Sequence, residues 1–185
     1  MEIPWEDKVK AILYMGLPGQ AGGQAVYNLL TGRTVPSGKL TESWPVSYED
    51  VISRETFGKK NVEYREGIYV GYRYYEKAGI RVRYPFGYGL SYTSFSYHDL
   101  EIQENRVSVK ITNTGDLTGT EVVQLYIAPP EEGIFRPEKE LKGFVRIELK
   151  AGETKTATFK LDDRSFAIWN QGWRIPEGKY TVMIG

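Results

Sequence analysis

Three pairs of nearby carboxylates are the residues of this sequence that could do acid–base chemistry together: Glu63 with Glu66, Glu131 with Glu132, and Asp162 with Asp163. Two carboxyl groups roughly 5–10 Å apart, on either side of a sugar, are what hydrolysis of a glycosidic bond requires. Adjacent residues on a strand point to opposite faces, which disfavours the second and third pairs. The stretch around Glu63 is more typical of local salt bridges. We therefore predict no catalytic residue in this chain.

Other catalytic chemistries are poorly supplied with residues. The chain contains no cysteine, which excludes a cysteine nucleophile, a thiolate metal site and a disulfide framework. His98 is the single histidine, so a metal centre with several histidines is excluded and a Ser-His-Asp triad is disfavoured. A lone histidine with no nucleophile motif nearby is most often structural. We therefore expect no cofactor and no bound metal.

A glycine-rich bend at residues 19–23 is the remaining candidate for a binding site. Its sequence, G-Q-A-G-G, has neither the spacing of a dinucleotide-binding loop nor the Lys-Ser/Thr of a phosphate-binding loop. It fits a turn between a strand and a helix, where glycine supplies torsions that other residues avoid. The alternative is a loop at the carboxyl edge of a sheet, where such folds bind ligands. In that case Gln20 is the substrate-binding residue.

The charge balance argues against large charged partners. Lys and Arg number 24, as do Asp and Glu, so the formal net charge is zero. This predicts binding neither to nucleic acid nor to an acidic membrane. No stretch approaches about 18 consecutive apolar residues, and residues 1–7 lack the pattern of a signal peptide. We expect a soluble, bacterial protein that is cytoplasmic or is exported as part of a longer parent chain.

Residues 1–45 are expected to be the C-terminal remnant of an α/β domain. An almost continuous apolar run at 8–16 predicts a strand buried on both faces. Residues 24–30 then place apolar side chains on one helical face, and Gly32 is positioned to cap that helix. A second strand is predicted at 39–44. One β-loop-α-turn-β unit is too small for an α/β domain, so its strand and helix need partners.

The rest of the chain changes character twice. Residues 46–93 are irregular and rich in tyrosine, and we expect this connecting segment to wrap over a surface and bury its rings. From about Phe95, apolar and polar residues alternate with a period of two, between turns that contain Gly or Pro. This pattern predicts an immunoglobulin-like antiparallel β-sandwich over 94–185. The predicted fold class is mainly β, an antiparallel β-sandwich preceded by a small α/β unit.

Several motifs in this order resemble one known family. They are residues 4–5 (PW), 11–13 (AIL), 18–23 (PGQAGG), 36–40 (PSGKL), 64–74 (YREGIYVGYRY), 85–93 (PFGYGLSYT), 113–115 (NTG), 121–126 (EVVQLY), 139–144 (KELKGF) and 178–182 (GKYTV). Together they are similar to the C-terminal portion of glycoside hydrolase family 3, of the β-glucosidase type. The resemblance covers essentially all 185 residues. One such motif is weak evidence, but this many in order are specific.

The resemblance implies a parent enzyme of several domains. Such enzymes have a barrel of (β/α)8 type, an α/β sandwich and often a fibronectin type III-like module. Residues 1–45 resemble the end of the α/β sandwich, 46–93 its connection, and 94–185 the fibronectin-like module. The family works by a retaining mechanism, with an Asp nucleophile in the barrel and a Glu acid/base in the α/β sandwich. Both are expected upstream of Met1, so no catalytic residue carries over to this chain.

This resemblance predicts a structural role within a β-glycoside hydrolase. The parent is expected to be the glycosidase, whereas this chain, which looks cut at both ends, is expected to be inactive alone. Its expected partner is the missing N-terminal catalytic part of the parent, or a second copy bound through residues 8–44. A β-glucoside substrate is expected only in the whole enzyme. The alternative is a stand-alone β-sandwich that binds carbohydrate or another protein.

Overall fold

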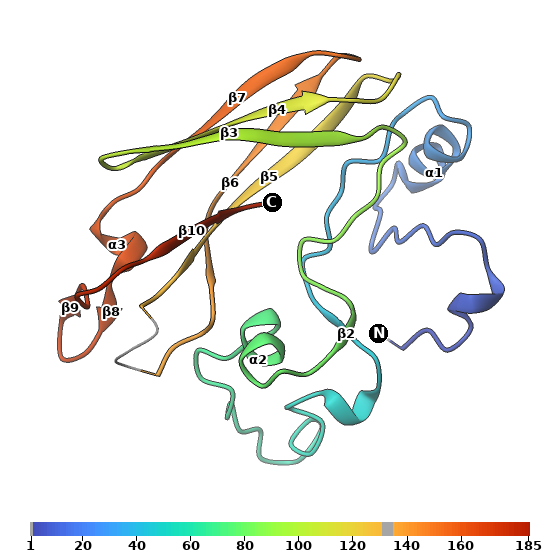
Figure 1. Ribbon diagram of the computed structural model, residues 1–185. Helices are drawn as coiled ribbons and strands as arrows, with labels where there is room; N and C mark the ends of the chain where they lie inside the picture. Colours follow the sequence, from blue (N-terminus) through green and yellow to red (C-terminus); the bar gives the residue numbers. More distant parts are fainter. Residues whose placement is uncertain (1, 131–134) are drawn as a thin grey trace.

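The computed structural model describes residues 2–130 and 135–185 of the chain (Figure 1). The elements are, in order, η1 (Glu6–Lys8), α1 (Gly22–Leu30), β1 (Trp44–Pro45), η2 (Tyr48–Asp50), α2 (Tyr72–Lys77), β2 (Val82–Tyr84), β3 (Phe95–Gln103), β4 (Arg106–Asn113), β5 (Gly119–Ala128), β6 (Glu140–Leu149), β7 (Thr154–Lys160), α3 (Asp163–Phe166), β8 (Ile168–Trp169), β9 (Trp173–Arg174) and β10 (Thr181–Ile184). None of the helices in these two ranges has the length and apolar character needed to cross a bilayer.

Two antiparallel sheets of three strands form a β-sandwich in the second half of the chain. One sheet has the order β3-β4-β7 and the other β10-β5-β6 (Figure 1). The central strands β4 and β5 turn alternate side chains inward, and Ile111, Val123 and Leu125 are fully buried between the sheets. Burying such a side chain contributes about 1.5–3 kcal/mol. The structure therefore confirms the β-sandwich predicted from the period-two pattern.

Strand β6 was not among the strands that the alternation predicted. It pairs with β5 over its whole length, from Glu140 opposite Ile127 to Leu149 opposite Gly119. Its alternation is hard to read because Phe144 lies on the solvent side, while Gly143 stands where an inward side chain would meet Phe159. An added Cβ at Gly143 would lie 3.0 Å from the Phe159 ring. Glycine here leaves space for that ring in the core.

The first predicted strand is wrong for this structure. Residues 8–16 form no strand, and the side chains of Leu13 and Tyr14 are exposed. A strand buried on both faces needs neighbours to complete its hydrogen bonds, and within the described residues no strand lies beside it. The second predicted strand, at 39–44, is reduced to Trp44 and Pro45 of β1, which pairs with β2.

The predicted helix is confirmed and begins two residues earlier than expected. Helix α1 ends at Leu30, and Gly32 follows with φ +70°, the left-handed conformation that ends helices. The amide of Gly32 donates to the carbonyl of Leu29. The apolar face of α1 is only partly covered: Val26 and Leu29 are half-buried, but the Leu30 side chain is 70% exposed.

The aromatic residues of 46–93 are less buried than predicted. Tyr75 of α2 is buried, whereas Tyr64 is 90% exposed and Tyr88 and Tyr92 lie at the surface. The expectation that this whole segment buries its rings is therefore wrong for this structure. The rings that do pack against the sandwich include Tyr72, which stacks on Phe86 and meets Tyr126 of β5.

Asn113, at the end of β4, is a polar residue placed fully inside the sandwich. Its side-chain oxygen accepts hydrogen bonds from the Thr93 hydroxyl at 2.6 Å and from the Gly115 amide at 3.1 Å. Its amide nitrogen donates to the carbonyls of Leu117 and Leu149. These bonds fix the turn after β4 to the start of the sandwich and to the end of β6.

We predict that Asn113→Ala lowers the free energy of unfolding by about 2–4 kcal/mol, because it leaves several buried polar groups without a partner. Urea unfolding followed by tryptophan fluorescence measures the change. Asn61→Ala, at an exposed position, is the matched control and should change stability by less than about 0.5 kcal/mol. Equal effects of the two variants would contradict the role given to Asn113.

Candidate functional site

The three carboxylate pairs have structural roles or lie outside the described residues. Glu63 accepts a hydrogen bond of 2.5 Å from the Nε of Arg65, as predicted for a local salt bridge. Glu131 and Glu132 lie outside the described residues. Asp162 precedes α3, where its carboxylate accepts from the Ser165 amide at 3.0 Å. Asp162 therefore caps a helix, and Asp163 is the first residue of that helix rather than part of a strand.

The carboxylates with shifted pKa values are all held as anions. Among the described residues these are Glu6, Asp99, Glu140, Glu153 and Asp162, and in each case the pKa lies below its ordinary value. For Glu6 the main causes are hydrogen bonds from Tyr84 and Arg83. A general acid at neutral pH needs the opposite shift, towards a raised pKa. These five carboxyl groups are therefore suited to ion pairs and caps.

His98 and Gln20 both lie at the surface. The Nε2 of His98 is 2.9 Å from the Thr112 hydroxyl, and its Nδ1 is 3.2 Å from Asp99, which also accepts from Lys110. Gln20 is exposed in the turn before α1, and it lines neither the cleft beside α3 nor the cleft between α2 and β5. Within those residues, no three His, Cys, Asp or Glu side chains gather as they would around a metal ion.

Helix α2 and the bend at 85–89 contact the sandwich at β5 and β6. We call this contact the α2–β6 junction. The Tyr72 ring stacks on Phe86 with a centroid distance of 4.9 Å and meets Tyr126 of β5 edge-on at 6.1 Å. The hydroxyl of Tyr72 accepts a hydrogen bond of 2.8 Å from the Leu141 amide of β6. One tyrosine thus connects the bend, α2 and both strands.

Gly87 allows the bend to approach β5 closely. Its φ is +82°, and an added Cβ would lie 2.6 Å from the side-chain oxygen of Gln124. The backbone on either side is fixed to residue 40, since the Gly87 amide donates to the Leu40 carbonyl and the Leu40 amide donates to the Tyr88 carbonyl, both at 2.8 Å. Only glycine satisfies both the torsion and the space.

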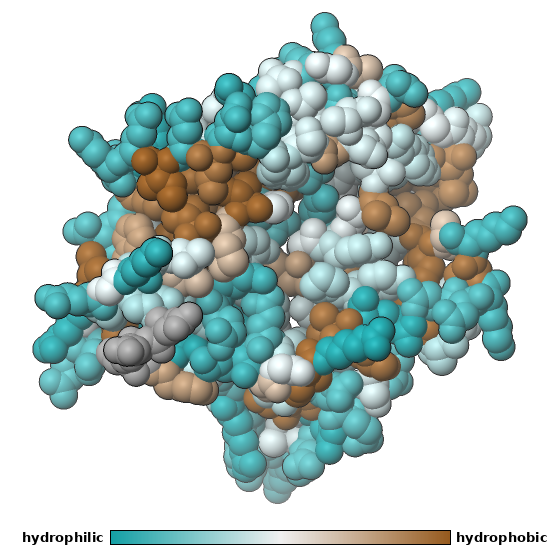
Figure 2. Space-filling view, in the orientation of Figure 1, coloured by the Kyte–Doolittle hydropathy of each residue, from teal (hydrophilic) through white to brown (hydrophobic). Residues whose placement is uncertain are grey.

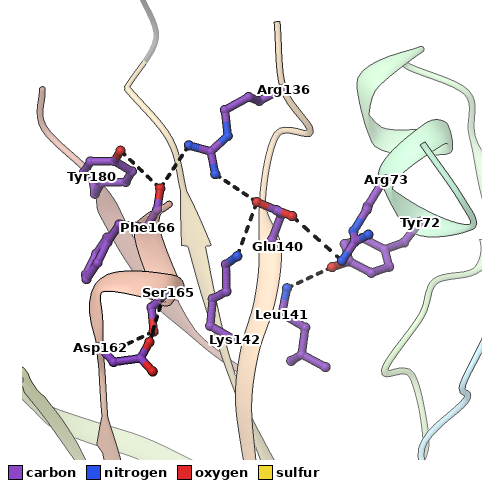
Figure 3. Close-up of polar contacts among 10 residues, drawn as sticks. All are labelled: Tyr72, Arg73, Arg136, Glu140, Leu141, Lys142, Asp162, Ser165, Phe166 and Tyr180. Carbon is purple, nitrogen blue, oxygen red and sulfur yellow. Dashed lines mark hydrogen bonds and ion pairs between the residues drawn. The ribbon is translucent and has the colours of Figure 1, made fainter. Parts of the chain in front are cut away.

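An ion network centred on Glu140 closes the junction (Figure 3). The carboxylate of Glu140 lies 3.0 Å from Arg136 and 3.4 Å from Lys142, both in the second half of the chain. It also lies 3.8 Å from Arg73 of α2, in the first half. Burial alone raises the pKa of Glu140, but Lys142, Arg136 and Arg73 outweigh it and hold the pKa below its ordinary value. Two outer ion pairs flank this group, Lys77 with Glu138 and Lys139 with Glu76.

A further ion pair joins the first half to β5. Lys39 lies 3.0 Å from Glu121, which is buried and also accepts a hydrogen bond of 2.9 Å from the Tyr97 hydroxyl. Burial, together with the negative charge of Glu121, raises the pKa of Tyr97. The tyrosine therefore stays protonated and donates, which satisfies a carboxylate that would otherwise be costly to bury.

A cleft of about 340 Å³ opens between the two halves at this junction. It is visible as a hollow near the centre of Figure 2, and its walls include Tyr72, Phe86, Tyr88, Tyr126, Lys139 and the end of β10. Burial, with smaller effects from Tyr72 and Glu76, raises the pKa of Tyr126 to about 12. The cleft thus holds a neutral Tyr126 and charge-paired side chains, which suits a packed contact between two parts.

Sequence reasoning did not identify Glu140, Arg73 or Tyr72 as functional residues. All three lie inside motifs quoted for the family resemblance, at 64–74 and 139–144. The available signal was the presence of two motifs, far apart in sequence, that each combine charged and aromatic residues. Neither motif on its own indicates that the residues of 64–74 contact those of 139–144.

We predict that Glu140→Gln lowers the free energy of unfolding at pH 7 by about 2–3 kcal/mol, since Arg136, only 7% exposed, loses its anion. Because the folded pKa of Glu140 is below its ordinary value of 4.5, the stabilisation by its charge is present above that pH and is lost as the pH falls. Urea unfolding at several pH values should therefore show the difference from the unaltered chain shrinking below about pH 4.5. Glu138→Gln, at an exposed pair, is the control, and an equal loss in that variant would argue against the network.

The chain matches two known domain families. Residues 1–92 match the Glycosyl hydrolase family 3 C-terminal domain, and residues 121–185 match the Fibronectin type III-like domain. Thermostable beta-glucosidase B of Acetivibrio thermocellus is 44% identical over 198 aligned positions, covering 100% of this chain and 26% of that protein. An exo-alpha-(1->6)-L-arabinopyranosidase of Bifidobacterium breve is 41% identical and covers 98% of this chain and 25% of its own length.

Solved structures agree with these matches. Beta-glucosidase 3B from Thermotoga neapolitana superposes with a TM-score of 0.93 at 41% identity, covering 99% of this chain and 27% of that one. The GH3 beta-glucosidase of Bifidobacterium adolescentis gives 0.92 at 41% identity, covering 98% and 28%. The chain therefore spans about a quarter of the length of the relatives it matches. It belongs to glycoside hydrolase family 3 and corresponds to the C-terminal region of that family's enzymes, with its fibronectin type III-like domain.

Proposed function

We propose that this chain acts as the brace of a β-glycoside hydrolase, a part that holds catalytic domains together without contributing a catalytic carboxylate. The observation that carries the proposal is the coverage. The relatives match this chain over 98–100% of its length, yet the chain spans only about a quarter of theirs. The remaining three quarters of such an enzyme hold the barrel and most of the α/β sandwich that the resemblance implies.

The uncovered apolar surface of the first half supports this proposal. Leu17 is fully exposed, Leu30 is 70% exposed, and Tyr14 and Tyr27 are about half exposed. Hydrophobic atoms gather on this side of the molecule, around α1 and the segment before it (Figure 2). Large contiguous apolar patches on a folded surface mark contacts with another protein part. The proposed occupant is the rest of the α/β sandwich, whose strands would also complete the hydrogen bonds of residues 8–16.

The rigidity of the α2–β6 junction supports the same role. A structural support must keep the parts that it joins in a fixed relative orientation. Aromatic stacking around Tyr72 and the Glu140 ion network hold the first half against the sandwich in this way. Within residues 2–130 and 135–185, the carboxylates with shifted pKa values are stabilised as anions, which suits structure rather than proton transfer.

The substrate belongs to the whole enzyme and is proposed to be a β-glucoside. Most of the relatives described above are named beta-glucosidases, and one is named an arabinopyranosidase, so sugar choice is set outside this region. Gln20 is exposed ahead of α1, at the side where the catalytic part is proposed to dock. We propose that its amide faces the sugar cleft only in that assembly.

We predict that the purified chain does not hydrolyse nitrophenyl β-glucoside above background, because the retaining mechanism needs a nucleophile and an acid/base carboxyl group. A hybrid that carries this chain in place of the corresponding C-terminal quarter of the Acetivibrio thermocellus enzyme should hydrolyse it. Release of nitrophenol measures both. Turnover that follows the isolated chain through gel filtration would contradict the proposal, as would a folded hybrid without activity.

We also predict that the isolated chain self-associates through residues 8–44, since this segment exposes several apolar side chains, among them Leu17 and Leu30. Leu30→Lys places a charge at the centre of this face and should convert the oligomer to monomer. Leu90→Lys, at a leucine 75% exposed outside that region, is the matched control and should leave the oligomer unchanged. Light scattering at high micromolar concentration tests this, and a clean monomer of the unaltered chain would contradict it.

A further inference from the structure

Two exposed tryptophans stand opposite one another on the hairpin formed by β8 and β9. Trp169 is 67% exposed and Trp173 is 51% exposed, and the strand register pairs them directly. Their ring centroids are 5.5 Å apart and their planes meet at 69°. Tryptophan is the residue that gains most from burial, so two indoles left on one small hairpin are not accounted for by packing.

The hairpin holds the indoles in a fixed arrangement. Its turn passes through Gln171, with φ +53°, and is closed by a hydrogen bond of 2.9 Å from the Asn170 amide to the Gly172 carbonyl. The guanidinium of Arg164 in α3 lies 3.3 Å from the centroid of the Trp173 ring and supports it. The Asp162 cap in turn fixes the start of α3. A site built in advance loses little entropy on binding.

The position of the hairpin separates it from the surface assigned to the catalytic part. Figure 1 shows β8 and β9 at the opposite end of the molecule from α1 and the segment before it. The residues of the α2–β6 cleft do not include any residue of the hairpin. A brace docked through α1 would therefore leave the tryptophan hairpin in solvent.

We propose that the corner between Trp169 and Trp173 is a binding site for a neutral β-linked glucose oligosaccharide. The choice of ligand class rests on the proposed function, in which this chain is part of a β-glycoside hydrolase. Such a site would hold an oligosaccharide on the whole enzyme, away from the catalytic cleft.

The chemistry of the corner fits this ligand. A β-glucose ring carries its hydroxyls around the rim, which leaves two flat faces of C–H groups that pack on an aromatic face. Two indoles at an angle can contact one such ring on its face and at its edge. The exposed side chains of Asn170 and Gln171 lie in the turn next to the two indoles and offer donors and acceptors to the rim hydroxyls.

The four tryptophans of the chain give a direct test. Cellohexaose is titrated into the 15N-labelled chain while the indole N–H signals are followed by NMR, with assignments from Trp169→Phe and Trp173→Phe. We expect the signals of Trp169 and Trp173 to move together, while those of Trp5 and Trp44 stay in place. No movement of the two hairpin signals, or equal movement of all four, overturns the site.

Substitution then measures what the corner contributes. Trp169→Ala should weaken the affinity for cellohexaose about tenfold, as expected for loss of one aromatic contact. Phe144→Ala is the matched control, because Phe144 is a 70% exposed aromatic residue on β6, and it should bind normally. Unchanged affinity in Trp169→Ala overturns the proposal. If that variant does not fold, the titration of the unaltered chain still decides.

Two further outcomes are separated by the same samples. Hairpin signals that move with protein concentration, in the absence of sugar, would show that a second copy occupies the corner, which also overturns the site. A negative titration alongside an active hybrid enzyme rejects the tryptophan site alone. An inactive hybrid with a positive titration rejects the brace and keeps the site.

Discussion

The apolar side chains that β4 and β5 turn towards one another are the contact on which the rest of the structure depends. Each strand is the centre of its sheet, with β3 and β7 beside β4, and β6 and β10 beside β5. Burial of Ile111, Val123 and Leu125 gives both sheets a fixed separation and orientation. The remaining contacts, including the junction with the first half, are built on the outer surfaces and ends of these strands.

The first half is held to this sandwich by interactions of a different kind. Its contacts are directional, namely the stacked ring of Tyr72, the ions around Glu140 and the pair of Lys39 with Glu121. Buried charges of this kind add little net stability compared with apolar side chains, but they tolerate few alternative geometries. The arrangement therefore fixes the angle between the halves, while the apolar face of α1 remains free for a larger contact.

The sequence could predict those parts whose structure is determined by local pattern. The alternation around Val109 and Leu125 has one solution, a half-buried strand, and Gly32 ends a helix wherever that helix forms. The apolar residues at 8–16 predicted a strand that this structure does not contain. A strand needs neighbouring strands, and the apolar pattern does not show whether they are present. Residues such as Glu140 and Arg73 could not be found, since their function depends on a contact between segments far apart in the sequence.

The same reasoning explains why the two tryptophans of the β8–β9 hairpin went unnoticed in the sequence. Trp169 and Trp173 have the spacing of a short hairpin with an ordinary turn, and an indole in a β-rich chain is expected to be buried. Only the structure shows that the hairpin projects from the sandwich and that Arg164 fills one side of the pair. In the proposed role, the end of the molecule with α1 contacts the catalytic part. The end with the β8–β9 hairpin makes no such contact. Exposed aromatic residues at that end either have no function or bind a ligand. Because Trp169 and Trp173 are held together in one corner, we favour a binding role.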